Sequence, residues 1–413
     1  MTTFHTTTLS NGLRIIQEPC PTENVYCGIL IGAGTRHEDP NDSGLAHFCE
    51  HVTFKGTERR KACHIRNCLE RIGGDLNAYT NKEETTYYAT VQSEHFARAV
   101  DILTDIVFHS IYPAAELKKE TEVIIDEIDS YRDSPAELIY DEFDAMLFRN
   151  HPLGRDILGN AERLRTYSTE DALRFTRKNY VPSNATFYVL GNVPFEKTVR
   201  LIERATADFS PANDGKGAFT SCPEQLLPPY QQEDRVSQHD THQAHVLIGN
   251  RCFGRSHAQR PALFLLSNIL GGPGMNALLS VDLREKRGLV YTVDCSAFHY
   301  SDTGVWSVYF GCDETDVEHC RKRVMHILEQ MREKPLSETR LQAAKRQAIG
   351  QIMLGQDHFE SRALAMGKVY AHSGEHRDIQ TLINRLQSVT PSDIQLVAQD
   401  IFAPDQLSTL VYK

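Results

Sequence analysis

The sequence lacks a long uninterrupted apolar run, an excess of basic residues and closely spaced cysteine pairs. Without an apolar run of about 20 residues, no membrane-spanning helix is expected. Lys and Arg number 44 against 55 Asp and Glu, and the resulting net charge of -11 argues against a nucleic-acid-binding surface. The 10 cysteines are scattered, so we expect reduced and mostly buried thiols instead of a disulfide framework.

The first ten residues also lack a basic leader and an apolar stretch. Secretory and mitochondrial targeting segments are therefore not expected, and the prediction is a cytoplasmic protein. A chain of 413 residues is long for one domain and suits two, each large enough to bury its own core.

Two halves of the chain show a similar order of predicted elements. Each half contains β-branched runs typical of strands, followed by longer helical patterns. Between them, residues 210–239 are rich in Pro, Gly, Ser and Gln, a composition typical of a linker. We predict an α+β fold made of two similar αβ domains, residues 1–209 and 240–413, that arose by duplication. Each would be a mostly antiparallel sheet packed with helices.

One short motif carries metal-binding chemistry. His47 and His51 belong to the pattern H-x-x-E-H, and on a helix they lie one turn apart on the same face. Their imidazoles can converge on one ion at about 2.0–2.1 Å. Glu50, three residues after His47, borders that face and would lie beside the ion. The pattern predicts a zinc helix in the domain 1–209.

Catalytic zinc needs a third protein ligand and one open position for water. We expect Glu127 to be that ligand, because Glu120 and Glu127 share one stripe of a predicted helix, 116–129, with apolar neighbours. Two carboxylates among apolar side chains are costly to bury without a cation. The expected cofactor is one Zn2+ per chain, held by His47, His51 and Glu127. A surface helix with two histidines, and a solvated charged face around Glu127, are the alternatives.

The motif and its surroundings resemble the signature of the pitrilysin family, which includes insulin-degrading enzyme and the mitochondrial processing peptidase. In that family a zinc-ligand Glu follows the motif by about 75 residues, and Glu127 follows His51 by 76 (127 − 51). The matching segments are 32–38 (GAGTRHE), 44–51 (GLAHFCEH), 54–57 (FKGT), 73–80 (GGDLNAYT), 86–87 (TY) and 283–291 (LREKRGLVY).

The resemblance implies a zinc metalloendopeptidase, a peptide bond hydrolase. Glu50 would act as general base for a zinc-bound water and then pass the proton to the leaving amine. Glu120, one heptad before Glu127, would orient a ligand histidine through its free ring nitrogen. An ordinary surface glutamate is the alternative for Glu120.

The resemblance also implies where substrate binds. Asn77 and Ala78 would lie on an exposed edge strand to which an extended peptide adds by main-chain hydrogen bonds. Arg284 and Tyr291, in the domain 240–413 that lacks the zinc motif, would donate hydrogen bonds to substrate carbonyl oxygens. The alternative for Arg284 is an ordinary position on a helix surface.

The length of the chain resembles the short branch of the family, in which two chains enclose substrate in a clamshell chamber. Both the zinc motif and the Arg284–Tyr291 pair are present here, so we expect a homodimer, with a heterodimer with a sibling chain as the alternative. Peptides or unfolded polypeptides are the expected substrates. A non-catalytic scaffold and a peptide-binding subunit of the same family are the rival functions. Cys49, where the family usually has Leu, is either a core filler or an oxidation-sensitive thiol.

Overall fold

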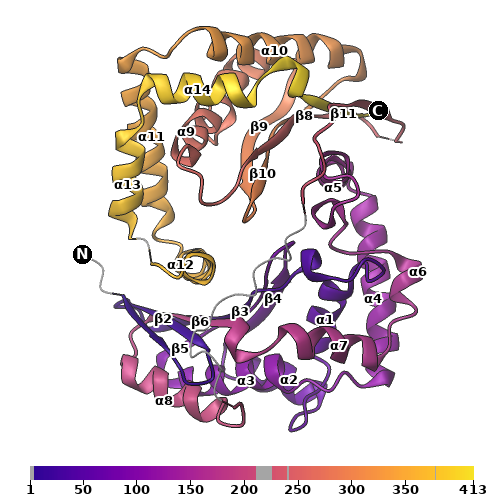
Figure 1. Cartoon of the computed structure of the whole chain (residues 1–413), viewed down its shortest axis with the longest axis vertical. Helices are drawn as coiled ribbons and strands as arrows, with labels where there is room; N and C mark the ends of the chain where they lie inside the picture. Colours follow the sequence, from indigo (N-terminus) through magenta and orange to yellow (C-terminus); the bar gives the residue numbers. More distant parts are fainter. Residues whose placement is uncertain (1–3, 211–225, 240, 377) are drawn as a thin grey trace. The chain divides into compact units, whose positions relative to one another are not determined.

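The computed structural model of the protein describes residues 4–210, 226–239, 241–376 and 378–413. The chain forms two compact units (Figure 1). Unit 1 comprises Met1–Asp129, Arg155–Gln225 and Gly355–Asp378, and unit 2 comprises Ser130–Gly154, Leu226–Leu354 and Ile379–Lys413. Each unit therefore contains a segment from the half of the chain that mainly builds the other unit.

Unit 1 is built on a six-stranded sheet with the order β1-β2-β6-β3-β5-β4. Neighbouring strands are antiparallel except for β2 and β6, which are parallel. Strand β6 is buried along its whole length, whereas β4 forms one edge of the sheet. The strands are β1 (His5–Thr8), β2 (Arg14–Pro19), β3 (Asn24–Ile31), β4 (Asp75–Thr80), β5 (Thr85–Gln92) and β6 (Ala185–Gly191).

Helices from the first half of the chain bury apolar side chains against this sheet and form one continuous core. Ile29 and Phe187 of the sheet and Leu103 of α3 are fully buried in it. The helices are α1 (Leu45–Thr53), α2 (Ala62–Glu70), α3 (Phe96–Phe108), α4 (Ala114–Arg132), α6 (Ala161–Leu164), α7 (Thr169–Asn179) and α8 (Phe195–Ala205). The core fixes α1, which carries the H-x-x-E-H motif, against the sheet.

The helix α12 (Phe359–Ser373) comes from late in the sequence but packs on β6 and β3 of unit 1 (Figure 1). Its Gly367 lies directly over the ring of Tyr188, where an added Cβ would come within 2.5 Å of a ring carbon. Ala363 and Tyr370 of α12 join Ile16 and Tyr188 in a second buried cluster. A glycine inside this helix is thus explained by the close approach of the helix to the sheet.

Unit 2 is built on a five-stranded sheet with the order β7-β11-β8-β10-β9. Its strands are antiparallel except for the parallel pair β7 and β11. The strands are β7 (Asp234–Ser237), β8 (Ala244–Phe253), β9 (Val290–His299), β10 (Thr303–Cys312) and β11 (Ser408–Tyr412), and the helices are α5 (Pro135–Leu147), α9 (Arg260–Gly271), α10 (Val317–Glu333), α11 (Glu338–Gly355), α13 (Ile379–Ser388) and α14 (Pro391–Ile401).

The helix α5 comes from the first half of the chain but belongs to unit 2. Its Ile139 and Phe143 are buried with Leu247 of β8 and Leu410 of β11. The exchange of α5 and α12 means that neither unit is made of one continuous stretch of chain.

The predicted fold class is confirmed, because both units combine a mostly antiparallel sheet with helices. The limits 1–209 and 240–413, and the duplication, stay predictions. Within the segment that we assigned to the linker, Asp234–Ser237 forms strand β7, and 211–225 lies outside the described residues. Among the helices of the described residues, none combines the length and the hydropathy needed to cross a bilayer.

Candidate metal centre

The helix α1 begins without a capping side chain of its own. Its N-cap residue Gly44 has φ +78°, and a Cβ there would come within 2.7 Å of the Gly159 Cα, so only glycine suits the position. The Glu38 carboxylate serves as the cap, because it accepts hydrogen bonds from the N–H groups of Gly44 and Ala46 at 3.3 and 2.8 Å. Burial raises the pKa of Glu38 to about 8. The segment 32–38 thus fixes the start of the motif helix.

Three side chains meet where α1 and α4 lie together: His47, His51 and Glu127, which we call the His47 cluster. Glu127 Oε2 is 3.9 Å from His47 Nε2 and 3.3 Å from His51 Nε2. A tetrahedral zinc ion with bonds of about 2.0–2.1 Å separates its ligand atoms by roughly 3.4 Å. The observed separations fit such an ion. The structure therefore brings together the three residues that the sequence analysis assigned to the metal.

Glu120, on α4, is not a member of the His47 cluster but contacts one of its histidines. Its Oε1 is 3.1 Å from His51 Nδ1, and its Oε2 is 2.5 Å from Lys55 Nζ. His51 thus turns Nδ1 to one glutamate and Nε2 to another, which fixes the plane of its ring. His47 differs, because its buried Nδ1 has no hydrogen-bond partner among the described residues.

The two histidines of the cluster differ in charge because their surroundings differ. Burial, together with nearby His51, lowers the pKa of His47 to about 4. Burial also opposes a charge on His51, but its hydrogen bonds to Glu120 and Glu127 raise its pKa to about 9. Without a metal ion, a proton on His51 thus balances the two carboxylates. A divalent cation would replace that proton, so the donor set fits zinc.

Glu50 lies beside the His47 cluster on the same helix and is 8% exposed. Its Oε2 accepts a hydrogen bond from the Thr80 hydroxyl at 3.0 Å. No hydrogen bond reaches its Oε1 from the described part of the chain. Burial raises the pKa of Glu50, so this carboxylate is more basic than an exposed one. One oxygen is anchored and the other is available to a water.

Asn77 and Ala78 lie on β4, which is an edge strand, as the sequence analysis expected. They pair with Tyr88 and Tyr87 of β5 on the inner side. The Ala78 N–H donates to the Asn77 side chain at 2.9 Å. At this point the Ala78 N–H is therefore bonded to the neighbouring side chain, and no further described strand pairs with the outer side of β4.

Arg284 and Tyr291 belong to unit 2, apart from the unit that holds the His47 cluster. Arg284 lies in a π-helical turn, Ser280–Glu285, and its Nε donates to Glu285 at 2.9 Å. Tyr291 is 71% exposed on the edge strand β9. π-Helical turns are frequent at functional sites, so the placement is compatible with a role in binding.

A second group of the same residue types, Glu83, Glu84 and His372, also brings its possible ligand atoms within 4.8 Å of one another. We call it the Glu84 cluster. Here protein cations already contact the carboxylates: Arg36 Nη1 lies 2.9 Å from Glu83 Oε1, and Lys368 and His372 contact Glu84. These ion pairs supply the positive charge that a metal would bring, so we interpret the cluster as a buried ion-pair network.

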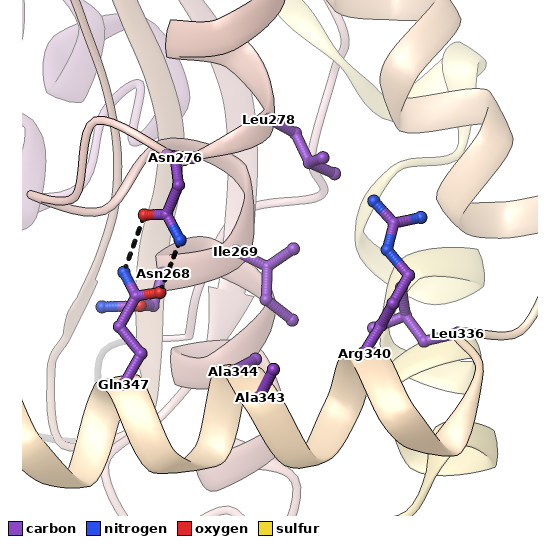
Figure 2. A pocket seen from close by; sticks show the side chains of 10 residues that line it. Asn268, Ile269, Asn276, Leu278, Leu336, Arg340, Ala343, Ala344 and Gln347 are labelled. Carbon is purple, nitrogen blue, oxygen red and sulfur yellow. Dashed lines mark hydrogen bonds between the residues drawn. The ribbon is translucent and has the colours of Figure 1, made fainter.

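Unit 2 contains an open cavity of about 220 Å³ beside α9 and α11 (Figure 2). The Asn276 and Gln347 side chains exchange hydrogen bonds of 2.8 and 3.1 Å across it (Figure 2). The Asn268 amide donates to Gln351 at 2.8 Å. None of the sequence-predicted site residues lines this cavity. Its amides are paired with one another, so the cavity adds nothing to the metal centre.

The sequence analysis assigned no role to Glu38, Lys55 or Thr80. All three lie inside the segments that matched the family signature, which was the available signal. The contacts themselves join residues far apart in the chain: Thr80 reaches Glu50 across 30 positions, and Lys55 reaches Glu120 across 65 (120 − 55). Only the folded chain shows what these side chains touch.

Comparison with known proteins agrees with this geometry. A family model described as Insulinase (Peptidase family M16) matches residues 14–161, which include the whole His47 cluster. A second model, described as Peptidase M16 inactive domain, matches residues 166–348. The chain is 32% identical over 405 residues to a protein named uncharacterized zinc protease YmxG from Bacillus subtilis (strain 168). That match covers 98% of this chain and 97% of the relative.

Solved structures agree on the fold. A protease from Helicobacter pylori has a TM-score of 0.89 at 21% identity, covering 100% of this chain and 99% of that one. A structure from Pseudomonas fluorescens, described as a peptidase M16 inactive domain, has a TM-score of 0.88 at 17% identity, covering 99% and 97%. At these identities the structures establish only the fold. The two family models, which together match most of the chain, and the relative that is named a zinc protease establish more: the chain belongs to peptidase family M16, the insulinase family.

Proposed function

We propose that this chain is a zinc-dependent endopeptidase that hydrolyses peptides or unfolded segments of polypeptide. The observation that carries the proposal is the meeting of His47, His51 and Glu127 beside the buried, half-anchored carboxylate of Glu50. Two imidazoles and one carboxylate are the ligand types of catalytic zinc sites in peptidases. A non-ligand glutamate next to them is the group that such hydrolysis needs as its base.

When bound, a zinc ion supplies Lewis-acid chemistry: it polarises the scissile carbonyl and makes the attacking water acidic. The protein's own part begins with Glu50. Its Oε1, which no described hydrogen bond occupies, takes the proton from the attacking water, while Oε2 stays anchored to Thr80. Glu50 then passes this proton to the nitrogen of the leaving amine. Burial assists, because it raises the pKa of Glu50 and so strengthens it as a base.

Glu120 contributes by holding His51. Its hydrogen bond to Nδ1 selects the tautomer in which Nε2 carries a lone pair for the metal. Lys55 stabilises the charge of Glu120 in turn, because its ammonium group lies beside the second carboxylate oxygen. We therefore assign Glu120 to the orientation of His51.

The edge strand β4 supports an extended peptide as substrate. An incoming strand can add to β4 by main-chain hydrogen bonds, with its carbonyl replacing Asn77 as the acceptor for the Ala78 N–H. Binding through the main chain selects extended and unfolded segments more than particular side chains. In unit 2, the exposed Arg284 and Tyr291 are our candidates for further hydrogen bonds to substrate carbonyl oxygens.

The test compares the wild type with Glu50→Gln. Both proteins should bind one zinc ion per chain, measured by elemental analysis, and only the wild type should cleave a quenched fluorescent peptide. If both bind zinc and neither cleaves any member of an unstructured peptide library, the chain is a peptide-binding or scaffold subunit. If the wild type binds no zinc, the metal assignment itself fails.

We further propose a homodimer with two active sites, located in the cytoplasm. The nine cysteines that the structure describes are free thiols, which supports a reducing compartment. Sedimentation of the active enzyme tests the assembly: a fully active monomer would contradict the dimer, and a requirement for a sibling chain would replace it with a heterodimer. We expect neither nucleic acid nor membrane among its partners.

A further inference from the structure

The contact between Thr80 and Glu50 links two different elements of unit 1. Glu50 lies on α1, and Thr80 is the last residue of β4. Both side chains are 8% exposed, and the Thr80 hydroxyl donates to Glu50 Oε2 at 3.0 Å. A glutamate has three rotatable side-chain bonds, so one fixed donor decides which way its carboxylate faces. The donor must itself be held still for this to work.

Thr80 is held by the turn that follows it, residues 81–84. Within the turn, Asn81 N–H donates to the Glu84 carbonyl at 2.8 Å, and Thr80 pairs with Thr85 across the hairpin. From outside, the Arg36 N–H donates to the Lys82 carbonyl at 2.7 Å. Most hairpin turns are exposed, but this one is buried. The backbone of the turn thus forms hydrogen bonds both within the turn and to the segment that contains Arg36.

The side chains of the turn are fixed as well. Glu83 pairs with Arg36 at 2.9 Å, and both side chains are almost fully buried. Glu84 accepts hydrogen bonds from Asn81 and His372 at 3.0 Å each, and Lys368 completes its surroundings. The Glu84 cluster thus ties the turn to α12 and to the segment that precedes the motif helix.

We infer that Thr80 is a positioning residue for Glu50, and that the buried turn 81–84 is the support that keeps Thr80 in place. The inference rests on the proposed function, because Glu50 is the base in that proposal. Among the hydrogen bonds of the described residues, the Thr80 side chain donates to Glu50 Oε2, and it thereby directs Oε1 to the attacking water. Its loss should slow the chemical step and leave substrate binding unchanged.

Thr80→Val removes the hydroxyl and keeps the shape of the side chain, whereas Thr80→Ser keeps the hydroxyl. Since a positioned general base contributes about 10²–10⁴-fold, we expect Thr80→Val to lower kcat by about 10–100-fold with KM changed by less than about 3-fold. Thr80→Ser should restore kcat to within about 3-fold of the wild type. Thr104→Val is the matched control, because Thr104 is also a buried threonine and its hydroxyl forms hydrogen bonds only within α3.

Zinc content and thermal unfolding are measured for all variants, in addition to kcat and KM on one quenched peptide. The inference predicts that Thr80→Val loses kcat while its zinc content and unfolding temperature match those of Thr104→Val. It is overturned if Thr80→Val is as active as the wild type, or if its loss of kcat follows an equal loss of zinc. A wild type that does not cleave, or Glu50→Gln that does, would overturn the proposed function instead.

Discussion

Two clusters in unit 1 contain the same residue types but differ in what balances their charge. In the His47 cluster, two Nε2 atoms face one carboxylate oxygen of Glu127, and Lys55 contacts Glu120 instead. In the Glu84 cluster, Arg36 contacts Glu83 and Lys368 contacts Glu84, so both carboxylates already face a permanent protein cation. Proximity of His and Glu is therefore insufficient to identify a metal site. The deciding feature is whether an arginine or a lysine already contacts the carboxylates of the cluster.

The same comparison separates the two histidines that matter. His51 lies between two glutamates and gains positive charge without a metal, whereas His372 serves as one of several donors to a single carboxylate. In the His47 cluster a metal ion can replace the proton of His51. In the Glu84 cluster the ion pairs already balance the charge. The predictions below test this difference, beginning with the largest effect.

Replacing His51 or His372 by alanine should separate the clusters most clearly. We expect His51→Ala to lose bound zinc and all measurable cleavage, because a ligand is removed. His372→Ala should keep one zinc ion per chain, because its cluster is balanced by Lys368 and Arg36. Elemental analysis after dialysis measures both. Loss of zinc from His372→Ala alone would reverse the assignment of the two clusters.

Glu120→Gln should have the next largest effect. The amide still contacts His51 but carries no charge, so we expect zinc affinity to fall by about 10–100-fold. Competition with a chromophoric chelator measures the dissociation constant. Glu122→Gln is the matched control, because Glu122 lies on the same helix with a side chain that is 63% exposed. Equal zinc affinities in the two variants would remove Glu120 from the site.

Glu84→Gln should change stability and leave zinc in place. Burial opposes the charge of Glu84, but the hydrogen bond from His372 and the nearby Lys368 hold its pKa well below its usual range. The charged hydrogen bonds make the wild type more stable at pH 7 by about 1–3 kcal/mol. Because the folded pKa is depressed, this contribution is present above about pH 4.5 and is lost as the pH falls further.

Urea unfolding at several pH values checks this prediction. The wild type should lose more free energy of unfolding than Glu84→Gln between pH 6 and pH 3, and the two curves should approach each other at the acid end. Glu94→Gln, on an exposed side chain of the same unit, should follow the wild type. Parallel curves for the wild type and Glu84→Gln would show that the pKa of Glu84 does not differ between the folded and unfolded states.

The smallest effect is expected at Cys49, which lies in the motif but not in the cluster. The side chain is fully buried, and burial raises the pKa of its thiol well above the usual value, so the reactive thiolate is suppressed. These facts favour the role of core filler. We expect Cys49→Ala and the wild type to lose activity equally in dilute peroxide, measured by residual cleavage. Protection by Cys49→Ala would restore the thiol-switch hypothesis; Cys63→Ser, at an exposed thiol, is the comparison variant.

Local patterns in the sequence predicted many of the helices and strands, because an apolar periodicity marks the face that an element buries. The predicted helix 116–129 lies entirely within α4. Helix α12 was not predicted, because it has few buried residues and its central Gly367 is explained only by the contact with Tyr188. The exchange of α5 and α12 between the units was not predicted either, because it depends on contacts between distant segments.

The metal centre was predictable to the same extent. The positions of His47, His51 and Glu50 follow from helical spacing, and Glu127 from its stripe and from family resemblance. The supports of these residues were not predictable. The Lys368–Glu84 contact joins positions 284 apart, and no periodicity in the sequence relates them. The side chains that share one face of a helix can be derived from local spacing, whereas the contacts that hold the helix in place depend on the whole fold.

The late position of α12 in the chain has a consequence for synthesis. A ribosome that has made only the first 209 residues has synthesised every strand of the sheet in unit 1, but not the helix that covers Tyr188 and supplies Lys368 and His372. Such a nascent chain would expose an apolar face and leave Glu84 without its cations. We therefore expect that unit 1 matures only when nearly the entire polypeptide has emerged from the ribosome.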